Sequence, residues 1–356
     1  MATRLLVLGA GTGPSNNLIR SLRAGRRPYR IVGCHDDRFM LRKSSADHNY
    51  LVPNSSQPAF LDAICSVIES ERIDLLIPDS DPDVKAVSVL RDRIPCRVFL
   101  PANEVIDLCQ DKYALTMFLR ERGIPAPLTF PVSSIDEIDE IFLRLARNSR
   151  LWCRIRTGQG SAGALPVESA EQARSWIKYW EAIRGVPVTS FTISEYLPGR
   201  DYSLQCLWNE GKLVLSKMSE RLAYFNPGNS PSGMSSTPAL AKTVLEPQVA
   251  DVCSSAIAAV DPRASGIFCF DLKERADGTP CVTEINAGRF AMITNIYDMV
   301  GRHNMAVTYV RIAMGETVKI RNVHDFAADH YLVRDMDTLP DIYEANELFE
   351  GITDAR

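Results

Sequence analysis

Several features that would each define a class of protein are missing from this 356-residue sequence. The nine cysteines are scattered, with no Cys-x-x-Cys pair and no histidine at metal spacing, which excludes a zinc site and favours a reducing compartment over a disulfide framework. The net charge is -4 and no long Lys/Arg run occurs, so a nucleic-acid partner is not expected. The first apolar run is too short for a signal peptide or a membrane span. We therefore expect a cytoplasmic protein with no membrane partner.

Hydrophobic residues make up 46% of the chain and charged residues 24%, as in ordinary soluble proteins, and the length suffices for two or three packed units. Short apolar runs at residues 5–8, 29–33 and 73–78 alternate with helical patterns, which predicts a parallel sheet. We interpret residues 1–105 as a Rossmann-like domain. The glycine turn at 9–13 resembles a dinucleotide site, but Pro14 stands where the third glycine belongs, so a structural turn is favoured.

A pair of acidic residues lies on two predicted strands joined at Asp277-Gly278, a favoured two-residue hairpin turn. A loop centred there places Asp271 opposite Glu284 and Cys269 opposite Asn286. The two carboxylates would repel each other unless something positive compensates. Two carboxylates and an amide oxygen on one face suit Mg²⁺ held together with phosphate oxygens. The alternative is a surface hairpin whose acids pair with Lys273 or Arg289.

The segment from 154 to 163, RIRTGQGSAG, holds three glycines and a serine within six residues, which predicts a mobile hairpin tip. Its backbone N–H groups, at Gly160 and Ser161 among others, can approach phosphates closely. Arg154 and Arg156 alternate with an isoleucine and would place two guanidinium groups beside the tip. The pattern indicates a phosphate-covering lid, with a plain flexible hairpin as the alternative.

A third segment, TISEYLPGRDYSLQCLW at 192–208, breaks at Pro198-Gly199 and resumes as a second strand. Free backbone groups beside Tyr196 and Leu197 are suited to hydrogen-bond the edge of a purine, and an acid a few residues away is suited to hold ribose hydroxyls. By itself the segment is an ordinary bent strand.

Taken in this order, the segments resemble the ATP-grasp superfamily, especially its carbamoyl phosphate synthetase-like branch and, in local spacing, D-alanine–D-alanine ligase. The resemblance covers about residues 1–315. It implies a Rossmann-like domain followed by an ATP-grasp fold, in which two α+β subdomains clasp ATP. It also implies roles for single residues: Lys112 of the Asp-Lys pair and Arg154 at the nucleotide, Glu195, Tyr196 and Leu197 at adenine, Asp201 at ribose, and Asp271, Glu284 and Asn286 at the metal.

Two positions depart from the family pattern: Ile155, where proline is frequent, and Cys269, where many ligases carry an arginine or another polar group. Charge developing in the transition state must then be met elsewhere. The candidates are Arg289, together with Lys217 and Arg221, which the resemblance places near phosphate or the acid substrate. The stretch 224–236, rich in Gly, Pro and Ser, predicts a mobile loop over the substrate.

The resemblance implies a Mg·ATP-dependent ligase that activates a carboxylate as an acyl phosphate for attack by an amine. The joining of two amino acids is one form of this reaction, and Mn²⁺ is an alternative metal. Two alternatives remain: phosphorylation of carbamate or bicarbonate, and a regulatory protein that binds ATP without chemistry. We expect the ATP-grasp domain over 106–320, its small lid subdomain over about 125–197, and a C-terminal extension of unknown role over 321–356. The partners would be small-molecule acid and amine substrates, and a homodimer is the base-rate expectation.

Overall fold

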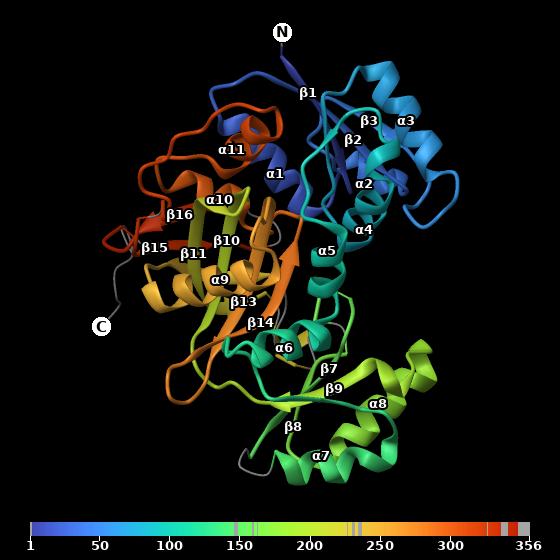
Figure 1. The fold of residues 1–356 in the computed structure, drawn as a ribbon, viewed down its shortest axis with the longest axis vertical. Helices are drawn as coiled ribbons and strands as arrows, with labels where there is room; N and C mark the ends of the chain where they lie inside the picture. The colour runs from blue at the N-terminus through green and yellow to red at the C-terminus, as the bar shows by residue number, and fades with distance from the viewer. Residues whose placement is uncertain are drawn as a thin grey trace, which may run out of the picture.

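The computed structural model describes residues 2–145, 149–158, 160–161, 163–225, 227–229, 232–233, 237–325, 327–335 and 341–347. These residues form three β-sheets with helices packed around them (Figure 1). All nine cysteines are free. No helix among the described residues is long and apolar enough to cross a membrane.

The N-terminal sheet is parallel, with the strand order β3-β2-β1-β4-β5. Its strands are β1 (Thr3–Leu8), β2 (Tyr29–His35), β3 (His48–Leu51), β4 (Leu75–Ile77) and β5 (Arg97–Val98). Its helices are α1 (Gly13–Ala24), α2 (Arg38–Arg42), α3 (Phe60–Glu71) and α4 (Asp81–Leu90), with a 3-10 turn η1 (Arg91–Arg93). Since right-handed βα connections pack helices on a parallel sheet, this is the Rossmann-like arrangement that the strand–helix alternation predicts.

The glycine turn after β1 is used for packing. Gly11 has a φ of +91°, and a Cβ added there would lie 1.8 Å from the carbonyl oxygen of Met40. The backbone of α2 therefore fills the space beside this glycine. This contact agrees with a structural turn rather than a dinucleotide site.

Two helices, α5 (Asn103–Gln110) and α6 (Lys112–Glu121), lead from the parallel sheet to the rest of the chain. Asp111 caps α6 as its sequence predicts, accepting hydrogen bonds from the backbone N–H groups of Tyr113 and Ala114, both at 3.0 Å. This cap places Lys112 at the first position of the helix, with its side chain buried.

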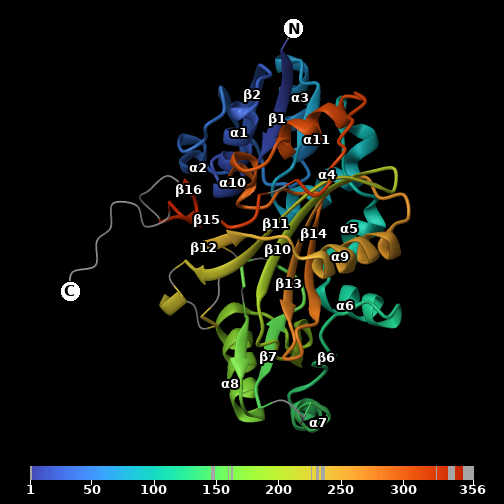
Figure 2. The same ribbon diagram turned by 90° about the vertical axis from the view of Figure 1, so that its left-hand side faces the viewer.

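The smallest sheet has the order β6-β9-β7-β8 and lies at the far end of the molecule from the parallel sheet (Figures 1 and 2). Its strands are β6 (Thr129–Pro131), β7 (Leu151–Ile155), β8 (Leu165–Val167) and β9 (Phe191–Glu195). One face packs against α7 (Ile138–Arg144) and α8 (Ala170–Arg184), with 3-10 turns η2 (Ile135–Glu137) and η3 (Val188–Ser190) beside them. The other face carries Trp152 and Arg154 and is free to meet a ligand.

The largest sheet has seven strands in the order β14-β13-β10-β11-β12-β15-β16. The strands are β10 (Asp201–Asn209), β11 (Lys212–Tyr224), β12 (Pro238–Thr243), β13 (Gly266–Glu274), β14 (Pro280–Ala287), β15 (His330–Val333) and β16 (Asp341–Glu344). The last two belong to the predicted C-terminal extension, so the extension completes one edge of this sheet. The boundaries of the domains themselves stay a prediction.

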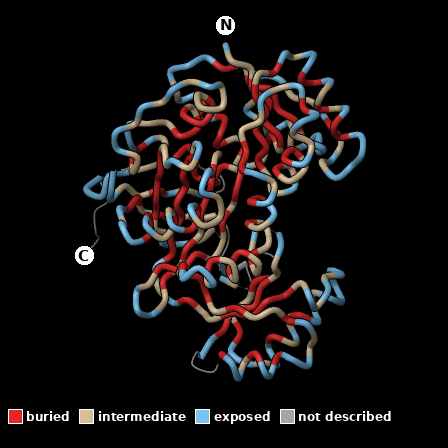
Figure 3. The backbone as a smooth tube through the Cα atoms, in the orientation of Figure 1, coloured by how far each residue is buried: buried red, intermediate tan, exposed pale blue. Residues whose placement is uncertain are grey.

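The two faces of the large sheet are covered differently. Helix α9 (Pro247–Val260) packs on one face, in a core shared with Phe268, Phe270 and Ile285. On the opposite face, α10 (Thr294–Met299) covers part of β10 and β11, and α11 (Met305–Ala313) packs with α1. Figure 3 shows buried backbone running through the large sheet into the parallel sheet. The part of the second face that α10 leaves open faces the small sheet.

Candidate active site

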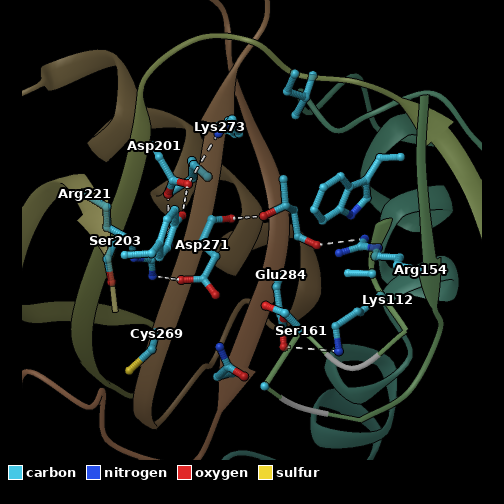
Figure 4. Close-up of a pocket in the computed structure, with 18 of the residues that line it drawn as sticks. Lys112, Arg154, Ser161, Asp201, Ser203, Arg221, Cys269, Asp271, Lys273 and Glu284 are labelled. Atoms are coloured by element: carbon cyan, nitrogen blue, oxygen red, sulfur yellow. Dashed lines mark hydrogen bonds and ion pairs between the residues drawn. The ribbon is translucent and has the colours of Figure 1, made fainter. Parts of the chain in front are cut away.

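A cavity of about 460 Å³ lies between the large sheet and the small sheet (Figure 4). Residues from four regions of the chain line it: the start of α1, the start of α6, the small sheet with its glycine loop, and the large sheet with the segment that follows β14. Most of the residues that the sequence predicts for the site come together here: Lys112, Arg154, Gly160, Ser161, Glu195, Tyr196, Leu197, Asp201, Arg221, Asp271, Glu284, Asn286 and Arg289.

The paired strands β13 and β14 form the floor of the cavity with the predicted register. Asp271 lies opposite Glu284 and Cys269 opposite Asn286, which confirms the pairing read from the sequence. The predicted two-residue turn is wrong, however. Arg275 pairs with Thr279 by a 2.9 Å hydrogen bond around a three-residue loop, and a bulge after Asp271 shifts the register by one residue. The two offsets cancel, so the acids still face each other.

Two cations from outside the hairpin compensate the facing carboxylates. Arg221 on β11 forms an ion pair with Asp271 and a second one with Asp201, at 2.9 Å, and the Nζ of Lys112 lies 3.3 Å from Glu284. Burial lowers the pKa of Arg221, but the charges of Asp271 and Asp201 outweigh it and hold the pKa well above the usual value. The partners considered from the sequence are not the ones found, because Lys273 pairs with Asp201 and Arg289 with Asp81.

The donor set on this floor fits a hard divalent cation. Asp271 and Glu284 offer carboxylate oxygens on one face, and the amide oxygen of Asn286 follows one step along the same strand. Among the described residues, no cluster of three His, Cys, Asp or Glu side chains is placed to hold a metal. The three oxygen donors leave coordination positions for phosphate oxygens and water, which is how Mg²⁺ is usually bound.

On the opposite wall, Arg154 points from β7 into the cavity and donates from Nη2 to the carbonyl oxygen of Thr283 at 3.1 Å. Its Nε is buried without a hydrogen-bond partner among the described residues. Burial lowers the pKa of Arg154, and the charges of Glu284 and Asp271 offset this in part. A buried guanidinium with unused donors is suited to bind an anion.

The glycine loop closes this wall. Gly160 and Ser161 both have a left-handed backbone, with φ of +71° and +58°, and both line the cavity. Lys112 donates from Nζ to the carbonyl oxygen of Gly158 at 2.5 Å, so the loop and α6 are held together. Gln159 and Ala162 of the predicted lid lie outside the described residues.

Arg156 requires a correction. Its guanidinium turns to Asp111, with Nη2 2.5 Å from Oδ2, and stacks over Tyr113. The hydrogen bonds from Arg156 lower the pKa of Asp111 despite partial burial. Arg156 therefore braces the start of α6 and does not line the cavity with Arg154.

At the hinge between the sheets, Tyr196 and Leu197 line the cavity, as predicted for a purine-facing segment. The carboxylate of Glu195 is engaged by the protein itself: it accepts from the backbone N–H of Leu128 at 2.7 Å and pairs with Arg275 at 2.8 Å. Asp201, the predicted ribose ligand, lies beside them at the start of β10.

Asp201 is held by three groups of the protein. Arg221 lies 2.9 Å away, Lys273 lies 3.7 Å away, and the hydroxyl of Tyr224 donates to the second carboxylate oxygen. A ribose hydroxyl must therefore share or displace one of these contacts. The predicted mobile loop over 224–236 begins at Tyr224 and falls partly outside the described residues.

Lys217 also requires a correction. Its pairing with Gln205 places it on the cavity side of the large sheet, but α10 covers it, and it is 0% exposed. Its ammonium group donates to the carbonyl oxygen of Tyr297 at 2.8 Å and pairs with Asp298 at 3.3 Å. Lys217 therefore holds α10 on the sheet and does not contact a nucleotide.

Arg289 joins the metal strand to the N-terminal sheet. Its Nε lies 2.5 Å from Asp81 at the start of α4, and its Nη2 donates to the amide oxygen of Asn286 at 2.5 Å. Burial lowers the pKa of Arg289, but Asp81 outweighs it and the net shift is upward. The sequence shows the acidic segment around Asp81, but nothing in it indicates this partner 208 residues away.

Cys269 occupies the floor between Gln205 and Arg289. Its thiol donates to the side-chain oxygen of Gln205 at 3.5 Å and lies 3.3 Å from the carbonyl oxygen of Arg289. Burial raises the pKa of this thiol well above its usual range. The position at which the family resemblance leads us to expect an arginine or another polar group therefore carries an uncharged thiol.

Two sheets close on a cavity that has paired carboxylates on one wall and a buried guanidinium on the other. The charges of the two walls fit an anionic ligand together with a cation. The profile of the ATP-grasp domain matches residues 109–291. The chain therefore belongs to the ATP-grasp family. The predicted family, the mixed α/β fold and the class of enzyme, an ATP-dependent ligase, are confirmed at this level.

Solved structures share this fold over nearly the whole chain. L-amino acid ligase from Bacillus licheniformis matches with a TM-score of 0.66 and 13% identity, over 93% of this chain and 78% of that chain. Biotin carboxylase from Campylobacter jejuni, in a β-γ-ATP complex, matches with a TM-score of 0.72 and 13% identity, over 94% of this chain and 76% of that chain. Carboxyaminoimidazole ribonucleotide synthase from Aspergillus clavatus, complexed with ATP, matches with a TM-score of 0.67 and 13% identity, over 93% of this chain and 81% of that chain. No curated protein sequence matches the chain.

Proposed function

We propose that this protein is a Mg·ATP-dependent carboxylate–amine ligase that works through an acyl phosphate. The observation that carries the proposal is the direct pairing of Asp271 with Glu284 inside the cavity, opposite Arg154 and beside Lys112. The two facing carboxylates, with the amide oxygen of Asn286 beside them, are the oxygen donors that Mg²⁺ prefers when it is bound together with phosphate groups.

The roles follow from the positions. Tyr196 and Leu197 would bind adenine at the hinge, and Asp201 the ribose. Arg154, Lys112 and the backbone of Gly160 and Ser161 would hold the phosphates. Asp271, Glu284 and Asn286 would hold Mg²⁺, which when bound supplies positive charge to phosphate oxygens.

In the proposed reaction, a carboxylate oxygen of the acid bonds to the γ-phosphorus while the bond from that phosphorus to the ADP oxygen breaks. The amine nitrogen then attacks the carbonyl carbon, phosphate leaves, and the nitrogen loses its proton to the solvent. This chain's residues mainly orient the groups and screen their charge. Arg289 is placed to bind the acid, and Arg221 forms an ion pair with Asp271.

The test is release of ADP and phosphate by purified protein with Mg·ATP, across pooled small carboxylic acids, amino acids and bicarbonate. Glu284→Gln should lower turnover by more than about a hundredfold, beyond what outer-sphere changes cause, in a protein that still folds and unfolds cooperatively. Glu171→Gln, at an 80% exposed carboxylate of α8, is the matched control and should behave as wild type. Full turnover in a folded Glu284→Gln protein would refute the assigned metal site.

A further inference from the structure

The strands of the floor divide the cavity into three successive rows. Counted from the hinge, β10 pairs with β13 as Asp201–Lys273, then Ser203–Asp271, then Gln205–Cys269. Figure 4 shows Lys273, Asp271 and Cys269 following one another along β13. Alternate residues of a strand lie about 7 Å apart. Asn286 faces Cys269 in the third row. If the hinge row takes the nucleoside, and the metal and phosphates lie between Asp271 and Asn286, as the proposed function requires, the acid lies at the third-row end of the cavity.

Apolar residues of the cavity lining stand beside the third row, whose floor is Gln205, Cys269 and Asn286. They are Pro14 at the start of α1 and the segment Ala291, Met292 and Ile293. This segment is held firmly: the N–H of Ala291 donates to Gln205 at 2.7 Å, and Asn17 donates to the carbonyl oxygen of Met292 at 2.5 Å. Ile293 packs against Ile296, Tyr297 and Leu332. The wall is therefore pre-formed and offers apolar contact to whatever lies at this row.

The acidic residues that line the cavity already have cationic partners within the protein. Glu195 pairs with Arg275, Asp201 with Arg221, Asp271 with Arg221 and Glu284 with Lys112. A cationic group of a substrate would thus find no unpaired carboxylate in the described lining of the cavity, and a buried charge without a partner is costly.

A cation that lines the cavity beside this row is Arg289, whereas Lys217 in the row itself is covered by α10. The bonds of Arg289 to Asp81 and Asn286 use Nε and Nη2, and among the described residues none uses Nη1, which can bind a carboxylate. A wall with one such guanidinium and an apolar surround fits a ligand with one charged end and one uncharged, apolar end.

From this combination, and on the basis of the proposed function, we infer that the acid substrate is a monocarboxylate whose remaining part is uncharged and apolar, rather than a free α-amino acid with an ammonium group beside its carboxylate. Arg289 binds the carboxylate, and Pro14, Met292 and Ile293 contact the apolar part.

The experiment compares acids that differ only in the ammonium group: 4-methylpentanoate with L-leucine, and 3-phenylpropanoate with L-phenylalanine. Hydroxylamine replaces the unidentified amine, because it traps an acyl phosphate as a hydroxamate. We expect ADP and hydroxamate with the acids that lack the ammonium group, with kcat/KM at least about tenfold higher than for the amino acids, because the ammonium would be buried unpaired.

A second arm places a carboxylate in the wall. Met292→Glu should lower the ratio of kcat/KM for 4-methylpentanoate to kcat/KM for L-leucine by at least about tenfold, as expected for a new buried ion pair. The neutral Met292→Gln should leave this ratio unchanged. Melting curves check that both variants are folded. An unchanged preference in folded Met292→Glu would overturn the assignment of this wall to the acid.

The outcomes separate the two proposals. Equal or better use of the amino acids would overturn the inference about the substrate and leave the ligase intact. If no acid, amino acid or bicarbonate yields ADP while Mg-dependent ATP binding persists, both the inference and the proposed function fail.

Discussion

Replacing Arg221 with methionine tests the electrostatic arrangement of the cavity. The guanidinium side chain is 11% exposed and lies between Asp201, 10% exposed, and Asp271, 31% exposed. Methionine keeps most of the volume and removes the charge. The variant therefore removes the guanidinium that lies between the carboxylates of Asp201 and Asp271 in the wild-type protein.

The expected loss is about 3 kcal/mol in the free energy of unfolding. Removing one partner of a buried ion pair costs about 3–5 kcal/mol. We take the low end because Asp271 is partly exposed and Asp201 keeps Tyr224 and Lys273 as partners. With an unfolding entropy of about 2.1 cal/mol/K per residue, this corresponds to a fall in Tm of about 4 °C for the whole chain.

The assay is thermal unfolding with and without MgCl₂, in the absence of nucleotide. In the variant, Mg²⁺ replaces the missing charge beside Asp271, so MgCl₂ should raise the Tm of Arg221→Met more than that of wild type. Lys273→Met is the matched control, since its ammonium group lies 3.7 Å from Asp201 and is 21% exposed. This control substitution should lower the free energy of unfolding by less than about 1 kcal/mol. If Arg221→Met has the same Tm as this control, and MgCl₂ does not raise that Tm, the reasoning is wrong.

Two further predictions concern groups behind the cavity. Lys217→Met should lower the Tm by a similar amount, through the loss of the pair with Asp298, while ATP affinity per folded molecule stays unchanged, as equilibrium binding would show. Asp79, 5% exposed, has both carboxylate oxygens buried without hydrogen-bond partners among the described residues, and burial raises its pKa well above the usual value. The carboxyl group of Asp79 therefore loses its proton at a lower pH in the unfolded chain than in the folded protein. As the pH rises from about 4, the free energy of unfolding falls by about 1.4 kcal/mol per pH unit, until the pKa of Asp79 in the folded protein is reached. The Tm of Asp79→Asn should therefore exceed that of wild type at pH 8 and differ little from it at pH 4. An equal difference in Tm at both pH values would contradict this prediction.

Local patterns in the sequence are sufficient to predict much of the fold. Apolar strands alternating with helices predicted the parallel sheet, and Asp111 predicted the start of α6. The pairing of Asp271 with Glu284 was also predicted, but from a turn that is not there. A three-residue loop and a bulge cannot be told from a two-residue turn by residue counting, because their offsets cancel.

The errors arise where distant segments meet. The family resemblance places Lys217 near the phosphates or the acid substrate, and the strand pairing does put it on the cavity side of the sheet. The sequence cannot show that α10, about 80 residues further on, covers it. Arg156 alternates with Arg154 as required, and its turn toward Asp111 depends on how β7 approaches α6. The roles of Asp81 and Arg275 likewise depend on packing between sheets, for which a single sequence carries no direct signal.

The hairpin of β15 and β16 has a consequence for the order in which the protein is made. Leu332 and Ile342 pack on the cluster that includes Ile293, one of the residues of the cavity wall. A chain emerging from the ribosome at about 5–20 residues per second folds its N-terminal parts first. The hinge, the glycine loop and the paired acids are all synthesised before this hairpin. A nascent chain can therefore assemble the nucleotide end of the cavity some seconds before its opposite wall has the support it has in the finished protein.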